Sequence, residues 1–212
     1  MYSPLTAAGR STTFAPCCFF CSIWTIINHP NFFWAVTAED LLRVENLRLM
    51  EVFNGHPNAN NVGGGGLRLL DEMWDVLLTA GRRIHGIAVD DAHNFKRIGR
   101  EFANPGKGWI QVHAESLTPA AIRGAIEQGH FYASSGVTLT GIQVSGAEYK
   151  IEIKPQATEK STTYFIGEGG KVLATTFATA AVYRFAGADK YVRASVESSF
   201  SGSAWTQPVF RR

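Results

Sequence analysis

The chain has 212 residues, of which 45% are hydrophobic and 18% charged, and its formal net charge is +2 at pH 7. These values are typical of a globular chain that forms one large domain or two small ones. The small net charge and the lack of any Lys/Arg run argue against a nucleic-acid partner. No apolar stretch reaches the roughly 18 residues needed to span a bilayer, so no membrane partner is expected.

Residues 1–27 form an atypical N-terminal segment. Its apolar run "FAPCCFFCSIWTII" has the length of a signal-peptide core but continues into "NHP" without a small-residue cleavage site. We therefore expect a strand that begins near Ser22, and we leave the compartment open between cytoplasmic and exported. Cys17, Cys18 and Cys21 lie in this segment, and no second Cys/His pair follows at a finger-like spacing, so unpaired thiols are expected.

Residues 28–136 alternate short apolar runs with helical periodicity. Thr37 precedes "AEDLLRVENLR", with Asp40 three residues on, which resembles a capping box at a helix N-terminus. Residues 49–55 have the pattern of a strand, and the apolar positions of residues 67–78 recur at three- and four-residue spacing, which predicts a helix that stops at Gly81.

The same alternation continues through "IHGIAVDDAH", a further strand. Thr118 then predicts the N-cap of a helix with Pro119 at its first position and Gly129 at its end, and residues 131–136 are again strand-like. Alternating strands and helices, with continuous apolar strands, predict a parallel α/β sheet covered on both faces.

Residues 137–212 have a different sequence pattern. Apolar and polar residues alternate, Gly-rich turns separate the runs, and "GEGG" fits a hairpin, so we expect a small antiparallel β-sandwich domain. Tyr183, Tyr191 and Trp205 are suited to stacking on a sugar, which keeps a carbohydrate- or protein-binding module open as a third class. Aromatic residues at strand spacing are more typical of a core.

Polar groups follow three of the predicted strands. These groups are Asn28-His29-Pro30 after the first strand, Glu51, Asn54 and His56 at the second, and Asp90, Asp91 and His93 at the third. Ligands bind at the carboxyl ends of parallel strands, because loops and helix N-termini converge there. The sequence therefore predicts one site at this edge of the sheet.

Imidazole and carboxylate together are ligands of zinc, manganese and iron. Asp91 and His93 are two residues apart, and such residues point the same way in extended backbone, so both can reach one ion. Asp90 or Glu51 would serve as the acceptor that fixes a histidine tautomer. Only the Asp91–His93 pair favours a metal by itself, because His29 before proline is typical of a turn and His56 of a polar loop.

Several ordered motifs resemble the PHP (polymerase and histidinol phosphatase) superfamily, in its branch related to the carbaryl hydrolase CehA. These motifs are "NHPN", "MEVFNGH", "GRRIHGIAVDDAH", "PGKGWIQVHAESLTPAAIRGAIEQGHFYASSG" and the terminal "AWTQPVF". The resemblance spans about Asn28 to the C-terminus. It implies a distorted (β/α)7 barrel that holds two or three divalent metals at its C-terminal mouth, where a metal-bound hydroxide attacks a phosphoester or a carbamate-like ester.

The resemblance also implies roles for individual residues. His29 matches the histidine of the "HP" motif, and Asp91 and His93 match the closing D-x-H pair, so these three would bind zinc, manganese or iron. Glu51 and Asn54 match a strand-end pair near the site. Lys107, in "GKGW", is placed either to meet an anionic oxygen of the substrate or as a solvated loop lysine.

The early motifs of the family are missing from this sequence. The H-x-H motif, the D-H pair and the bridging Glu have no counterpart in residues 1–27, which contain no histidine or acid. The expected fold is therefore the C-terminal portion of a PHP barrel at residues 28–136, followed by the β-sandwich at residues 137–212. Beside the binding module, two functions stay open: a metal-dependent phosphoesterase and an inactive or ligand-binding remnant. A partial barrel would expose a parallel edge that favours self-association.

Overall fold

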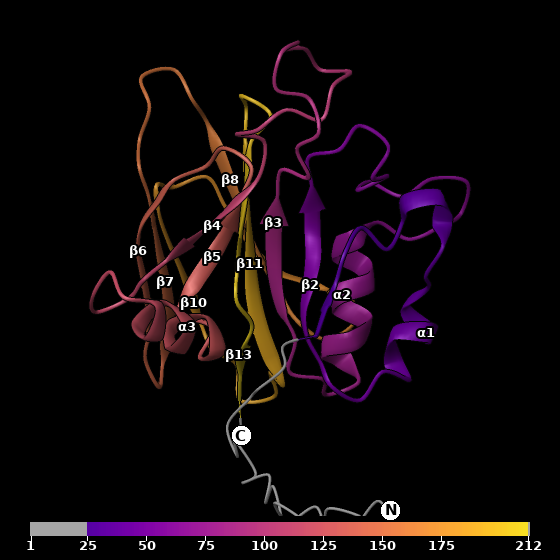
Figure 1. Cartoon of the computed structure of the whole chain (residues 1–212). Helices are drawn as coiled ribbons and strands as arrows, with labels where there is room; N and C mark the ends of the chain where they lie inside the picture. Colours follow the sequence, from indigo (N-terminus) through magenta and orange to yellow (C-terminus); the bar gives the residue numbers. More distant parts are fainter. Residues whose placement is uncertain (1–24, 212) are drawn as a thin grey trace, which may run out of the picture.

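The computed structural model describes residues 25–211 (Figure 1). The expectations for Cys17, Cys18 and Cys21, and for the start of the first strand near Ser22, lie outside the described residues. Within residues 25–211, every helix is too short or too polar to serve as a membrane span.

Three parallel strands form the first sheet, in the order β1-β2-β3. They are β1 (Thr25–Ile27), β2 (Leu47–Asn54) and β3 (His85–Val89). The 3₁₀ turn η1 (Phe32–Trp34) and helix α1 (Ala38–Leu42) connect β1 to β2, and helix α2 (Leu70–Thr79) connects β2 to β3. All three strands run the same way, so their carboxyl ends meet at one edge, which is at the top of Figure 1.

The other strands form two antiparallel sheets. The larger has the order β4-β5-β12-β11-β8-β9 with β13 also paired to β11, and the smaller has the order β10-β7-β6. The larger sheet consists of β4 (Trp109–Val112), β5 (Phe131–Ser134), β8 (Ser161–Ile166), β9 (Val172–Thr176), β11 (Tyr191–Ser198), β12 (Ser203–Thr206) and β13 (Val209–Phe210). The smaller sheet consists of β6 (Leu139–Val144), β7 (Glu148–Ile153) and β10 (Ala180–Arg184), while α3 (Pro119–Glu127) and the 3₁₀ turn η2 (Glu168–Gly170) are connections.

The expected combination of a parallel sheet with helices and antiparallel sheets is confirmed, but the described residues form no closed barrel. One strand lies in a different sheet from the one that the sequence predicts. The sequence predicts residues 131–134 in the parallel sheet, whereas β5 pairs antiparallel with both β4 and β12. All four residues of β5 are buried. A central antiparallel strand that is covered on both faces has a continuous run of apolar residues, as a buried parallel strand does, so the sequence does not distinguish the two.

The helix ends follow from local chemistry. Thr37 and Asp40 form the expected capping box at α1, with each side chain accepting a backbone N–H of the other residue. Thr118 accepts from the backbone N–H of Ala121 at the start of α3. The chain turns sharply after α2 at Gly81, whose φ of 81° costs glycine little.

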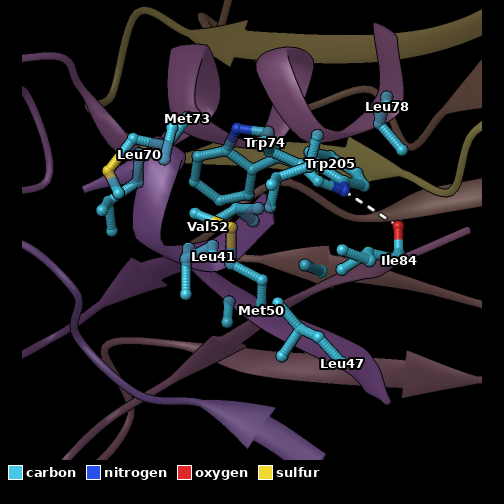
Figure 2. Packing of buried hydrophobic residues seen from close by; sticks show 14 of the residues in the cluster. Leu41, Leu47, Met50, Val52, Leu70, Met73, Trp74, Leu78, Ile84 and Trp205 are labelled. Atoms are coloured by element: carbon cyan, nitrogen blue, oxygen red, sulfur yellow. Dashed lines mark hydrogen bonds between the residues drawn. The ribbon is translucent and has the colours of Figure 1, made fainter. Parts of the chain in front are cut away.

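The first core lies around Trp74 of α2 (Figure 2). The indole N–H of Trp74 donates to the carbonyl of Ile84 at 2.9 Å, so its polar atom is satisfied inside an apolar cluster. A Cβ on Gly86 would lie 2.8 Å from the Trp74 ring, so only glycine permits this approach of β3 to α2. Tyr191 and Trp205 of the antiparallel sheet belong to the same core. The parallel sheet and the larger antiparallel sheet therefore share it.

A buried polar cluster joins α2 to β11. The Asp75 carboxylate accepts from Arg193 Nε at 2.7 Å, from Arg193 Nη2 at 2.6 Å and from the Tyr191 hydroxyl at 3.0 Å. Burial by itself lowers the pKa of the Arg193 guanidinium, but the Asp71 and Asp75 carboxylates beside it raise that pKa above its ordinary value. We call Asp75, Tyr191 and Arg193 the α2–β11 polar cluster.

Candidate functional site

The eight residues singled out in the sequence lie at the carboxyl edge of the parallel sheet or in the loops that leave it. Glu51 and Asn54 belong to the last half of β2, and Asp90 and Asp91 directly follow β3. His29 lies two residues after β1. The parallel direction of the strands brings together residues from β2 and from the loops after β1 and β3, although these three groups are more than twenty positions apart in the chain.

Glu51 is the buried acid of this edge, with only 3% of its surface exposed. Its Oε2 accepts from the backbone N–H of His29 at 2.6 Å and from Asn54 Nδ2 at 2.9 Å. Burial raises the pKa of the Glu51 carboxyl, and the two donated hydrogen bonds oppose that shift. Glu51 Oε2 thus holds the backbone of the His29 turn. The sequence suggested a different role for Glu51, as an acceptor for an imidazole.

Asn54 connects β2 to the end of β3. Its Nδ2 also reaches Asp91 Oδ2 at 3.3 Å, and its Oδ1 accepts from the backbone N–H of His56 at 2.8 Å. The side chain of Asn61 holds Asn54 in turn, donating to its carbonyl at 2.8 Å and accepting its N–H at 2.9 Å. A single buried amide therefore sets the positions of Glu51, His56 and Asp91 relative to one another.

Asp91 and His93 form a compact pair. His93 Nδ1 lies 2.7 Å from the backbone oxygen of Asp91, and because a carbonyl only accepts, Nδ1 carries the proton. The neutral ring then presents a lone pair at Nε2, which is the tautomer that a metal-binding histidine needs. His93 Nδ1 is 3.7 Å from Asp91 Oδ1, and 65% of the His93 side chain is exposed, so Nε2 is accessible.

The backbone is unusual at two of the three predicted ligands. His29 has a φ of 30° and Asp91 a φ of 48°, both in the left-handed region that residues with a Cβ rarely adopt. Aspartate and histidine are among the residues that tolerate this region, and such residues cluster at functional sites. The Glu51 hydrogen bond to His29 and the Asn54 hydrogen bond to Asp91 hold the two turns in place.

His56 lies beside His93 but has the other tautomer. Its ring centroid is 5.8 Å from that of His93, with the two planes perpendicular. His56 Nδ1 accepts from the backbone N–H of Asn58 at 3.2 Å, so the ring proton of the neutral form is on Nε2. The Phe32 ring stands between His56 and His29, with centroids 5.5 Å and 5.2 Å away. Sequence reasoning missed Phe32, which directly follows the "HPN" turn.

The side chains of Asp90 and Lys107 both bind backbone groups. Asp90 Oδ1 accepts from the backbone N–H groups of Lys107 at 2.6 Å and Gly108 at 2.8 Å, so this oxygen holds the backbone ahead of β4. The Lys107 amine donates to the carbonyl oxygens of Phe102 and Arg100. These contacts close the 91–107 loop, and they bind the Lys107 amine to backbone oxygens of that loop.

The donor types of this edge fit a divalent cation, but their number falls short. The carboxylate of Asp91 and Nε2 of His93 are suitable donors, whereas catalytic zinc sites use three protein ligands. Among residues 25–211, no group of three or more His, Cys, Asp or Glu side chains is gathered closely enough to hold an ion. Asp91 and His93 therefore form a two-donor pair.

The remaining histidines lie elsewhere. His85 of β3 packs its ring against the Phe131 ring at 5.8 Å, and burial lowers the pKa of its imidazole. His113 and His130 are exposed, as expected for surface residues. Asn104 was not anticipated: its side chain donates to the carbonyls of Asn94 and Arg97 and accepts from Gly99, which shapes the loop after Asp91.

Comparison of the chain with protein-family models, with curated proteins and with solved structures found no match.

Proposed function

We propose that this chain belongs to a metal-dependent hydrolase of the PHP type, which cleaves a phosphoester or a carbamate-like ester with zinc, manganese or iron. The fold it would supply is the C-terminal portion of the barrel at residues 28–136, followed by a β-sandwich at residues 137–212. The observation that carries the proposal is the Asp91–His93 pair, in which the Asp91 carbonyl fixes the His93 tautomer and leaves Nε2 accessible.

Two further features support the same site. Asn54 holds the carboxylate of Asp91 beside Glu51, and His29 has left-handed backbone fixed by Glu51. These contacts join the ends of the three strands at one edge, which is the edge where parallel α/β folds bind ligands. In this proposal Asp91 and His93 would bind the ion, with His29 as the third donor of the set.

A second candidate function is cation binding without hydrolysis. The observation that favours it is the lack of any three-ligand group among the described residues. A single weakly held ion cannot reproduce a centre of two or three metals, in which adjacent ions stabilise both the attacking and the leaving oxygen. The two candidates share the same ligands and differ only in turnover.

Metal content tests the site directly. The purified chain is stripped with chelator, dialysed against Zn²⁺ or Mn²⁺, and analysed for bound metal beside His93→Ala and the matched control His113→Ala. We expect about one ion per chain in the wild type and in the control, and a clear loss in His93→Ala. Equal metal in all three proteins, or none in any, contradicts the proposed site.

Turnover then separates the two candidates. The metal-loaded chain is assayed with p-nitrophenyl phosphate and with a p-nitrophenyl carbamate, with and without chelator. Hydrolysis that chelator and His93→Ala both abolish supports the hydrolase. Bound metal without hydrolysis of either ester supports the non-catalytic cation site.

A further inference from the structure

A groove separates the turn after α3 and the start of β5 from strand β6, away from the candidate metal site. Its volume is about 660 Å³, within the range of ligand-binding clefts. Figure 1 shows β6 and α3 on the side of the molecule opposite α1 and α2. None of the eight candidate site residues lines this groove.

Two sheet edges border the groove. Strand β4 is the last strand of the larger antiparallel sheet, and β6 is the last strand of the smaller one. Every residue from Leu139 to Val144 lines the groove, as do Gln111 and Val112 of β4. Successive side chains of a strand point to opposite faces, so a groove lined by six consecutive residues meets β6 along its edge.

The edge of β6 has few of the features that prevent natural edge strands from pairing with other chains. Its residues 139–144 include no charged side chain and no proline, and the only irregularity is a register shift between Leu139 and Gly141. Beyond that shift, Ile142, Gln143 and Val144 are all exposed. An accessible strand edge with unpaired backbone groups is a template for pairing with another segment.

The lining of the groove favours an uncharged occupant. Its nineteen lining residues include four glutamines and three histidines but no Asp, Glu, Lys or Arg. The floor is apolar, with Val112, Phe131 and Val209 among its residues. A charged side chain in such a place would lose hydration without gaining a partner, whereas amide and hydroxyl groups can pair with glutamine.

We propose that this groove binds an extended, uncharged peptide segment of a partner protein, which adds a strand to the free edge of β6. Backbone hydrogen bonds to β6 supply the pairing, and alternate apolar side chains of the peptide contact Ile142, Val144 and the groove floor. This function is independent of the proposed hydrolase, because the groove and the candidate metal site share no residue.

The test uses the full chain and a fluorescein-labelled, capped hexapeptide in which threonine and valine alternate. Fluorescence anisotropy measures the peptide's dissociation constant, and hydrogen exchange locates it. We expect saturable binding, added protection of the β6 amides beyond Leu139, whose N–H already donates to the Tyr132 hydroxyl, and loss of binding when the two central peptide nitrogens are methylated. N-methylation removes one donor from each edge of the peptide and leaves its apolar surface in place.

Protein variants give the matched control. Ile142→Lys introduces a charge on the β6 edge, and Val182→Lys introduces the same charge on β10, the opposite edge of the same sheet; the two side chains are 39% and 43% exposed. We expect Ile142→Lys to weaken binding by about tenfold or more and Val182→Lys to leave it unchanged. Undetectable binding, equal binding of the methylated peptide, or equal effects of the two substitutions overturns the proposal. So does a self-association that Ile142→Lys abolishes while the peptide fails to bind.

Discussion

Replacing Asp75 by alanine tests the α2–β11 polar cluster. Arg193 is fully buried, and the substitution removes both of its short hydrogen bonds and the partner of the Tyr191 hydroxyl. Breaking a buried ion pair by removing one partner costs about 3–5 kcal/mol, because the remaining charge is left uncompensated. Asp71 Oδ1 still lies 3.8 Å from Arg193 Nη1, so we expect the lower part of that range.

The measurement is urea unfolding at pH 7, followed by Trp fluorescence. A loss of about 3 kcal/mol would lower the urea midpoint by roughly 1–2 M without a change in the slope. The control is Glu148→Ala, which removes an ion pair with Arg184 whose side chains are 43% and 85% exposed. Such an exposed pair contributes less than about 1 kcal/mol.

Two outcomes separate a buried-charge effect from a simple loss of contacts. The double change Asp75→Leu with Arg193→Met removes both charges, and we expect it to lose less stability than Asp75→Ala alone, because no uncompensated charge remains. If Asp75→Ala shifts the midpoint no more than Glu148→Ala does, the reasoning from Arg193 burial is refuted.

Three further predictions concern single residues. Gly86→Ala should destabilise the chain by about 1–3 kcal/mol, since a Cβ would lie 2.8 Å from the Trp74 ring, and an unchanged urea midpoint would contradict this. Thr118→Ala should cost about 1 kcal/mol through loss of the hydrogen bond from Ala121, and Thr118→Ser should retain most of it. Burial lowers the pKa of His85 from 6.5, so the unfolded chain binds that proton more tightly. The stability from neutral His85 is therefore present above about pH 6.5 and falls as the pH drops below it. His85→Gln should flatten that part of the curve of Tm against pH, and parallel curves would contradict the assignment.

The helix termini were predictable because their chemistry is local. The capping box of Thr37 and Asp40 and the N-cap at Thr118 each depend on residues within four positions. Pairing between distant strands has no such signal. The four buried residues of β5 are compatible with parallel or antiparallel partners, and the pairing with β4 and with β12, which lies about seventy residues later in the chain, decides between them.

The candidate site was predictable in its composition and not in its contacts. Asp91 and His93 are two positions apart, so their proximity follows from the sequence, but Asp91 has left-handed backbone in place of the extended backbone that the sequence argument assumed. The bridge that Asn54 makes to Asp91 depends on the register of β2 against β3, which shifts between Glu51 and Phe53. A one-residue shift moves a side chain to the other face of a sheet, and no local pattern in the sequence specifies it.

The shared core around Trp74 has a consequence for how the molecule unfolds. The pattern of apolar and polar residues changes at about residue 136, which suggests two units. However, α2 packs on the parallel strands on one side and binds β11 through Asp75 on the other. Exposing either sheet would break the polar cluster and open that core. We therefore expect one cooperative calorimetric transition, with equal van't Hoff and calorimetric enthalpies, and a common rate of hydrogen exchange for the central amides of α2 and β11.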